Sequence, residues 1–358
     1  MVLPKELRTL VYKEIVNITE VISQLVEEKD ISAEVLIETV CEGMLVAYQK
    51  KYPNLVLKVE VDKGRSKLLV LVQKKIVATV ADEDREISLR KARAHSPSYE
   101  LDQEVWFPFE GTIGRVEVLK ARQVIASKIK MLESRVIWEA FKDKEGTIVH
   151  GYIHKREQNG ILVKIQDVLA FLPGSLSVPG EKYIPGHPIK ALLKEVLPEP
   201  RGENQLILDR ASSEFLAELF ELEVPEVFDS LVEIKKIVRI AGYKSKIAVA
   251  SHDDNVDPVG TCVGVGGARI RPILKEIGGE KIDIVQWSDS LEEFVQDALK
   301  PAKVNRVEVM DNRARVWVDE DQRSMAIGRL GQNISLASRL TGIDIDIAEN
   351  AGDVSIVD

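Results

Sequence analysis

The chain has 358 residues, of which 45% are hydrophobic, 30% are charged and 5% are aromatic, and its formal net charge is −9. This composition predicts a folded protein of several domains, because a domain usually spans about 100–200 residues. It excludes a protein that coats polyanions with its whole surface, because such binding needs a general excess of Lys and Arg.

The sequence carries no signal for a membrane or an oxidising compartment. No stretch approaches the roughly 20 apolar residues of a bilayer-spanning helix, and the N-terminus "MVLPKELRTLVYKEIV" has charges where a secretory signal is apolar. Cys41 and Cys262 lie far apart, without a CxxC pattern or a Cys/His cluster. We therefore expect a cytoplasmic protein with no membrane partner, no cofactor and no metal site.

Residues 1–137 predict helices around a small sheet. The first fifty residues have helical character, and "SAEVLIETVCEGMLVAYQKKY" shows an apolar period near 3.6 behind Ser32, a predicted N-cap. Two alternating segments, "LVLKVEVD" and "KLLVLVQKKIVATV", flank "KGRS", which predicts a hairpin with Gly64 in its turn. A long charged helix is expected in "GRVEVLKARQVIASKIKMLESRVIWEAFKDKEG".

Residues 138–211 predict a small β-barrel of the OB type. Five short strands are expected in "GTIVHGYIH", "NGILVKIQ", "VLAFLP", "HPIKALLKEVL" and "NQLILDRA", with a hairpin turn at Asn159-Gly160. His150, Tyr152 and His154 share one face of the first strand, because side chains alternate with period two. This face either stacks nucleobases, as OB barrels do, or is an ordinary solvated strand face.

The final region contains a repeat of two modules, at residues 212–288 and 289–358. The clusters "GVGG" and "GRLG" begin at Gly264 and Gly328, 64 residues apart. Each cluster is preceded by a predicted strand pair and followed by a helix, a glycine and a strand, "IDIV" or "IDIDI". A repeat of this kind indicates two copies of one structural unit.

The glycine clusters do not match the nucleotide-binding motifs. Arg269 occupies the third glycine position of a dinucleotide fingerprint, and neither cluster has the GK[ST] of a P-loop. A GxxG between two helices is instead what an RNA-binding KH module needs, because glycines admit a sugar-phosphate backbone beside a helix N-terminus. The alternative is a tight turn between two helices, and two clusters in register favour RNA.

The candidate RNA-binding residues follow from this pattern. In the first module they are Gly264, Val265, Gly266, Gly267, Arg269 and Arg271, and in the second Gly328, Arg329, Leu330, Gly331, Gln332 and Asn333. We expect Arg269 and Arg271 to be free for phosphate, because they lie outside the apolar stripe of their helix. That stripe is Ile270, Ile273, Leu274 and Ile277 in the first module, and Ile334, Ala337 and Leu340 in the second.

The last third of the chain nevertheless holds most of the excess acid. From Ser251 to Asp358 there are 12 Lys and Arg against 20 Asp and Glu. RNA can still bind if the acidic residues lie away from the two glycine clusters. The acids that we expect to lie away from them include Asp253, Asp254, Glu292 and Glu293.

The order of these parts resembles the NusA family of bacterial transcription factors over essentially the whole chain. The stretches that carry the resemblance are "KEGTIVHG", "VPGEKYIPG", "FLAELFELEVPEVFDSLVEIKKIVR", "SKIAVAS", "DPVGTCVGVGGARI" and "AIGRLGQNISLASRLTGIDIDI". The resemblance implies a multidomain α+β fold: an α+β N-terminal domain that binds RNA polymerase, an OB-fold barrel with an S1 motif, and two tandem type II KH domains.

The same resemblance implies a function without catalysis. Family members bind RNA polymerase and nascent single-stranded RNA, work with other Nus antitermination factors, and modulate pausing, intrinsic termination and antitermination. We expect a monomer. Three positions depart from the family pattern: Gly266 replaces an arginine, Leu330 replaces a glycine, and the barrel has Ile161 and Leu162 where many S1 motifs have aromatic residues.

Two other functions compete with this interpretation. Polynucleotide phosphorylases also combine KH and S1 parts, but in the reverse order and behind large catalytic domains. The segment "HDDNVD", from His252 to Asp257, imitates a metal or acid/base site, but we favour an acidic loop before the helix after Pro258, because the sequence shows no second ligand cluster. A ribosome-assembly protein is the third possibility, and polymerase binding would distinguish it.

Overall fold

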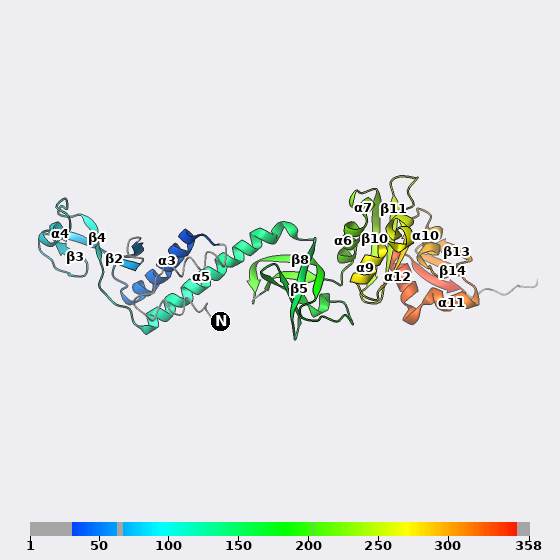
Figure 1. The fold of residues 1–358 in the computed structure, drawn as a ribbon, viewed down its shortest axis with the longest axis horizontal. Coiled ribbons are helices and arrows are strands. Elements are labelled where there is room, and N and C mark those ends of the chain that lie inside the picture. The colour runs from blue at the N-terminus through cyan, green and yellow to red at the C-terminus, as the bar shows by residue number, and fades with distance from the viewer. Residues whose placement is uncertain (1–30, 63–66, 203, 349–358) are drawn as a thin grey trace, which may run out of the picture. The chain divides into compact units, whose positions relative to one another are not determined.

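The computed structural model describes residues 31–62, 67–202 and 204–348 and divides into two compact units, residues 1–140 and 141–358 (Figure 1). Helical character predicted before residue 31 and the predicted turn at Gly64 lie outside the described residues. Within them, no helix is long and apolar enough to cross a membrane.

The described residues of the first unit form a four-stranded sheet and three helices. Ser32 caps the first helix by accepting a hydrogen bond from the Val35 amide, as predicted. The long central strand β2 pairs with each of the other three strands. The elements are α3 (Ala33–Lys51), β1 (Leu57–Asp62), β2 (Lys67–Val77), β3 (Glu86–Ser88), α4 (Leu89–His95), β4 (Glu104–Pro108) and α5 (Arg115–Phe141).

Helices α3 and α5 pack closely in this unit. Leu36 and Val40 of α3 share a buried cluster with Ile125 and Ile129 of α5. A side chain at Gly43 would bring its Cβ within 2.3 Å of Ile125 Cγ1, so the approach of the two helices requires glycine at this position.

Residues 148–209 form a closed five-stranded barrel, as predicted. The strands are β5 (Ile148–Glu157), β6 (Gly160–Ile165), β7 (Val168–Pro173), β8 (Pro188–Arg201) and β9 (Asn204–Asp209). They close in the order β5-β6-β7-β9-β8, with β7 and β9 parallel and the other pairs antiparallel. Alternate residues such as Ile153, Val163 and Leu193 are buried, so the interior is filled by side chains.

The last two modules have the same topology. The first consists of α6 (Ser213–Glu223), α7 (Pro225–Phe228), β10 (Val232–Ile240), β11 (Lys244–Ser251), α8 (Pro258–Val263), α9 (Ile270–Glu276) and β12 (Lys281–Gln286). The second consists of α10 (Leu291–Ala298), β13 (Arg306–Met310), β14 (Arg313–Trp317), α11 (Glu320–Ile327), α12 (Gln332–Thr341) and β15 (Asp344–Ala348). In both, the central strand is antiparallel to the first and parallel to the third, which confirms two KH modules.

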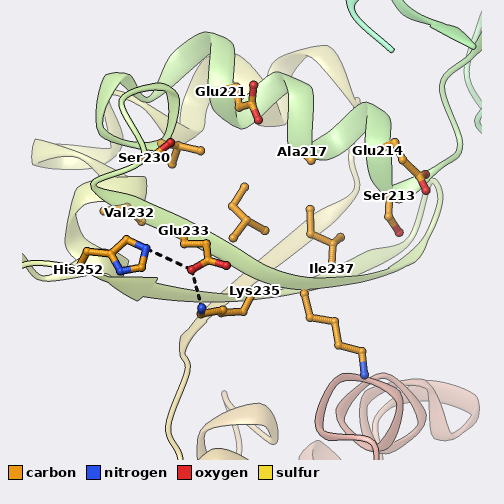
Figure 2. A pocket seen from close by; sticks show the side chains of 13 residues that line it. Ser213, Glu214, Ala217, Glu221, Ser230, Val232, Glu233, Lys235, Ile237 and His252 are labelled. Atoms are coloured by element: carbon orange, nitrogen blue, oxygen red, sulfur yellow. Dashed lines mark hydrogen bonds and ion pairs between the residues drawn. The ribbon is translucent and has the colours of Figure 1, made fainter. Parts of the chain in front are cut away.

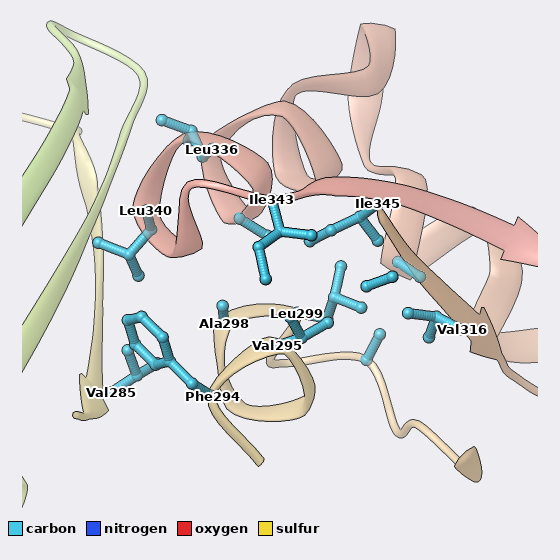
Figure 3. Close-up of a cluster of buried hydrophobic side chains, with 14 of the residues drawn as sticks. Val285, Phe294, Val295, Ala298, Leu299, Val316, Leu336, Leu340, Ile343 and Ile345 are labelled. Atoms are coloured by element: carbon cyan, nitrogen blue, oxygen red, sulfur yellow. The ribbon is translucent and has the colours of Figure 1, made fainter. Parts of the chain in front are cut away.

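The two KH modules share a hydrophobic core. Val285 of the first sheet lies in the same buried cluster as Phe294, Leu336 and Leu340 of the second module (Figure 3). Helix α12 also contacts β10 and β11 directly. The face of the first sheet that its own helices leave open is therefore covered by the second module, which couples the two modules by packing.

Candidate nucleic-acid interface

The two glycine clusters follow the same backbone path. The first glycines, Gly264 and Gly328, have φ/ψ of 75°/163° and 73°/173°. The third positions, Gly266 and Leu330, have 59°/22° and 54°/27°. Each cluster forms a single 3-10 turn between two helices, at Val265–Gly267 and Arg329–Gly331. We call these two turns, with their first glycines, the first and second clamp.

The two positions of each GxxG favour glycine for different physical reasons. A Cβ at Gly264 would lie 2.9 Å from Arg269 Cγ, and a Cβ at Gly328 would lie 2.7 Å from Asn333 Cβ. A Cβ at Gly331, in contrast, would meet nothing within 4 Å. The first glycine thus serves the packing of the protein itself, and the open side of the second is where a ligand backbone can approach.

Asn333 does not lie where the sequence predicted. Its side chain is only 4% exposed. Its Nδ2 donates to the carbonyls of Leu299 and Ala326, both at 3.1 Å, and its Oδ1 accepts from Lys244 Nζ at 3.0 Å. The structure corrects the prediction of an RNA contact, because these polar atoms are already used. Asn333 thus ties the second clamp to the rest of its own module and to Lys244 of the first module.

Arg269 occupies the equivalent place in the first clamp, and its charge is also engaged. Its Nη2 lies 2.8 Å from Glu226 Oε1, and its Nη1 donates to the Thr261 carbonyl at 2.8 Å. The hydrogen bond from Arg269 lowers the pKa of Glu226 below its usual value. The expectation that Arg269 is free for phosphate is therefore corrected.

Two cations remain available at the clamps. Arg271 follows the first clamp and Arg329 lies within the second, and both are exposed without an ion pair among the described residues. The Nε of Arg271 lies 3.5 Å from the position of a Cβ on Gly267, which places the guanidinium beside the open glycine. Each clamp thus has one unengaged arginine to meet a phosphate.

The clamp tips carry apolar side chains. Val265 is 98% exposed and Leu330 is 88% exposed, so neither contributes to a core. Leu330 holds a left-handed conformation that glycine adopts more easily, which makes this departure from the family pattern a strained one. Gln332, the next predicted contact, is half-buried, and its Oε1 has no hydrogen-bond partner within the described part of the chain.

A groove of 360 Å³ lies along α12, the helix that follows the second clamp. Its walls are helix α12 and the edge strand β15, and the lining residues are Arg313, Ile334, Ser335, Ser338, Asp344, Ile345 and Asp346. Sequence reasoning placed only Ile334 here, as part of a buried stripe. The available signal was the alternation "IDIDI" directly after the helix, which puts alternate aspartates on an edge strand.

His150, Tyr152 and His154 lie on one exposed face of β5, as their spacing predicts. Tyr152 is 61% exposed, and Val149 and Ile153, on the opposite face, are buried. The pairing of β5 with β6 shifts register between Ile153 and Lys155, so His154 lies at a β-bulge. Contact of this face with RNA remains a prediction.

Sequence reasoning missed a buried ionic network at the junction of barrel and first KH module. The Arg210 side chain is almost fully buried, with Nη1 2.7 Å from Glu276 Oε1 and Nη2 2.5 Å from Glu181 Oε1. Arg239 donates to both carboxylate oxygens of Glu280 at 2.8 Å and to the carbonyl of Arg210 at 2.9 Å. The network ties the barrel loop, the linker and the KH module together.

A second polar cluster lies between the two KH modules. Asp283 accepts from Lys244 and from Lys246, both at 2.7 Å, and Lys246 also donates to the Lys300 carbonyl at 2.8 Å. Burial lowers the pKa of Lys246 to about 8. Lys244 extends this cluster to Asn333 and hence to the second clamp.

Another hollow, of 520 Å³, lies between α6 and β10 of the first KH module (Figure 2). Three of its charged or titratable groups are paired, since Glu233 Oε2 lies 2.5 Å from Lys235 Nζ and 3.3 Å from His252 Nε2. The "HDDNVD" acids have local roles: Asp257 caps α8, and Asp253 accepts from the Asn255 amide. No group of three potential ligands for a metal occurs among the described residues.

Comparison with known proteins identifies the family. The NusA N-terminal domain matches residues 17–135, the NusA-like first KH domain residues 210–287, and the NusA-like second KH domain residues 291–354.

Three transcription termination/antitermination proteins NusA are similar to 92% of this chain. The protein from Thermus thermophilus is 36% identical over 346 residues, with 89% of its own length covered. Those from Halalkalibacterium halodurans and Bacillus subtilis are both 37% identical, with 87% and 90% of their lengths covered. With the closed barrel and the two KH modules in the expected order, the chain belongs to the NusA family.

Proposed function

We propose that this chain is a transcription factor that modulates pausing, termination and antitermination by holding nascent single-stranded RNA while its N-terminal domain binds RNA polymerase. The name shared by its relatives supports the transcriptional role. We further propose the domain limits 1–137, 138–211, 212–288 and 289–358, and a cytoplasmic monomer that works with other Nus factors.

The observation that carries this proposal is the pair of clamps. Two loops with matching backbone angles each combine a second glycine, where an added Cβ would meet no atom closer than 3.5 Å, with an unengaged arginine. Glycine lets a phosphate approach the backbone, and the N-terminus of α12 adds free N–H groups and partial positive charge at the second clamp. The adjoining groove then receives bases from the same strand.

The chain of contacts through Asn333 supports joint action of the two modules. Lys244 of the first module hydrogen-bonds the residue that packs against Gly328 in the second clamp. A strand of RNA that spans both clamps would therefore bind to a surface already ordered before binding, which reduces the entropic cost of association.

The test is a transcription assay with purified bacterial RNA polymerase on a template that carries a hairpin pause and an intrinsic terminator. We expect the full chain to lengthen the pause and to raise the terminated fraction. The same dwell time and termination with and without the protein would contradict the proposal. RNA binding without any effect on polymerase would instead favour an RNA-processing or ribosome-assembly role.

A further inference from the structure

We propose that the groove beside the second clamp selects bases that carry an exocyclic amino group, and that Asp344 and Asp346 make this selection. The inference rests on the proposed binding of RNA, and it assigns to these two residues a role in specificity.

The groove presents acceptors to whatever enters it. Asp344 and Asp346 lie on the free edge strand β15, are exposed, and form no ion pair within residues 31–62, 67–202 and 204–348. Buried Ile345 between them fixes the strand. On the opposite wall, the Ser338 hydroxyl donates to the Ile343 carbonyl at 2.6 Å, which leaves its oxygen as an acceptor.

The charged neighbours of these carboxylates lie on the next strand. Arg313 is the partner of Asp344 in the β14–β15 register, and Arg315 is the partner of Asp346. Both arginines are exposed and neither forms an ion pair with a described residue. The two carboxylates thus lie on a strand that pairs with two arginines, and their oxygens remain free to accept hydrogen bonds from a ligand.

An ionised carboxylate can only accept hydrogen bonds, and it repels phosphate. The amino groups of adenine, cytosine and guanine can donate hydrogen bonds to such an acceptor. Uracil has one N–H between two carbonyl oxygens, and these oxygens would be repelled by the carboxylate. Entry of a base without an amino group would leave the carboxylates desolvated and unpaired, which is costly. The groove therefore favours amino-bearing bases over uracil.

The first module has different chemistry at the same places. Arg271 lies 64 residues before Ser335, and Lys281 begins β12 as Asp344 begins β15. Asp283, the counterpart of Asp346, is already bound to Lys244 and Lys246. The first groove thus offers cations for phosphate, and base selection belongs to the second.

This assignment revises the expectation that the acids of the last third lie away from the clamps. Asp344 and Asp346 line a groove along α12, the helix that follows the second clamp. Acid in this groove suppresses indiscriminate binding of the phosphate backbone and leaves hydrogen bonds to base edges as the favourable contacts.

The test measures the affinity of the full chain for oligonucleotides of one length at one salt concentration. The most informative comparison is between the affinity for oligoadenylate and the affinity for a purine riboside oligomer of the same length. Purine riboside keeps the stacking ring of adenosine but lacks its amino group. We expect about tenfold tighter binding of the adenine oligomer, the size expected for one good base contact. An Asp344→Ala/Asp346→Ala variant, which removes both acceptors, should bind both oligomers about equally.

The control is Asp289→Ala, which removes a carboxylate from an exposed residue outside the groove and should keep the tenfold preference. Equal binding of the two oligomers by the unmodified chain, or a preference that survives in the double variant, would overturn the inference. Should the double variant not fold, the single Asp346→Ala variant and the unmodified chain decide the question. Failure of the unmodified chain to bind any RNA would instead overturn the proposed function.

Discussion

Gly328 and Gly331 both belong to "GRLG", but they have different structural roles because their surroundings differ. The first lies against the Cβ and backbone of Asn333, and the second faces open space. Arg269 packs against Gly264 in the same manner in the first module. A polar residue five positions after the first glycine thus braces each clamp: the buried amide of Asn333 in the second and the partly exposed guanidinium of Arg269 in the first.

This difference predicts unequal effects of adding a methyl group. Gly328→Ala should lower the free energy of unfolding by about 2–4 kcal/mol, because left-handed backbone strain adds to overpacking against Asn333. Gly331→Ala should cost only about 1 kcal/mol, from backbone strain alone. Urea denaturation followed by tryptophan fluorescence measures both, and equal losses would contradict the packing role of Gly328.

Lys246 predicts a dependence of stability on pH. Its pKa is about 8 in the fold and near 10.5 when solvated, so between these values the unfolded chain binds more protons than the folded chain. The contribution of Lys246 to the free energy of unfolding should therefore rise as the pH increases through this window. It should be lost as the pH falls through about 8.

Lys246→Met removes this titration and keeps the volume of the side chain. Unfolding of the variant and of the unmodified chain at about pH 7.5 and about pH 9.5 isolates the effect. We expect the unmodified chain to gain stability relative to the variant at the higher pH. The same difference between the two proteins at both pH values would show that Lys246 is not the responsible group.

At the scale of elements, Arg210 joins three parts of the fold. It lies between β9 and α6, and its guanidinium contacts the barrel loop through Glu181 and helix α9 through Glu276. Phe215 of α6 packs under both Arg210 and Arg239, with ring-centre distances of 5.2 and 5.7 Å. The linker is therefore part of a packed junction.

Loss of this arginine should be costly. Arg210→Met would leave two carboxylates without their partner in a buried setting, which lowers the free energy of unfolding by about 3–5 kcal/mol. The matched control is Arg201→Met, at an exposed position, with an expected change within about 0.5 kcal/mol. Thermal unfolding compares the two variants, and similar midpoints would refute the role of the junction.

The elements themselves could be predicted because their signals are local. Alternation and the Asn159-Gly160 turn indicated the barrel strands, and the 64-residue repeat indicated two equal modules. The network could not be predicted, because it joins residues far apart: Arg210 and Glu276 are 66 positions apart, and Arg239 and Glu280 are 41 apart.

The candidate site was predicted in outline and corrected in detail. Glycine spacing located both clamps, but a helical period cannot tell whether a polar residue at a helix start faces solvent or the turn before it. Asn333 and Arg269 face the turn. The aspartates of the groove were overlooked because acid near RNA was expected only far from the clamps.

At the scale of the whole molecule, the N-terminal unit should act independently. Residues 1–140 form a compact unit with their own core, and residues 17–135 match the NusA N-terminal domain. We predict that a fragment of residues 1–140 co-elutes with core RNA polymerase in size-exclusion chromatography. Residues 141–358 serve as the comparison, and a fragment that folds but elutes separately from polymerase would count against the proposed division of labour.

The central claim is that the two clamps hold RNA through their open glycines. The most direct test is the affinity of the full chain for single-stranded RNA after Gly267→Asp and Gly331→Asp together. An added Cβ would meet no protein atom closer than 3.5 Å at Gly267 and none within 4 Å at Gly331, whereas each new carboxylate would lie where a phosphate should lie. The control is Gly146→Asp with Gly180→Asp, which adds the same charges at two glycines of positive φ where an added Cβ meets nothing within 4 Å. We predict at least about tenfold weaker binding for the clamp variant, with a thermal midpoint close to that of the control. Unchanged affinity in a folded clamp variant would contradict the account.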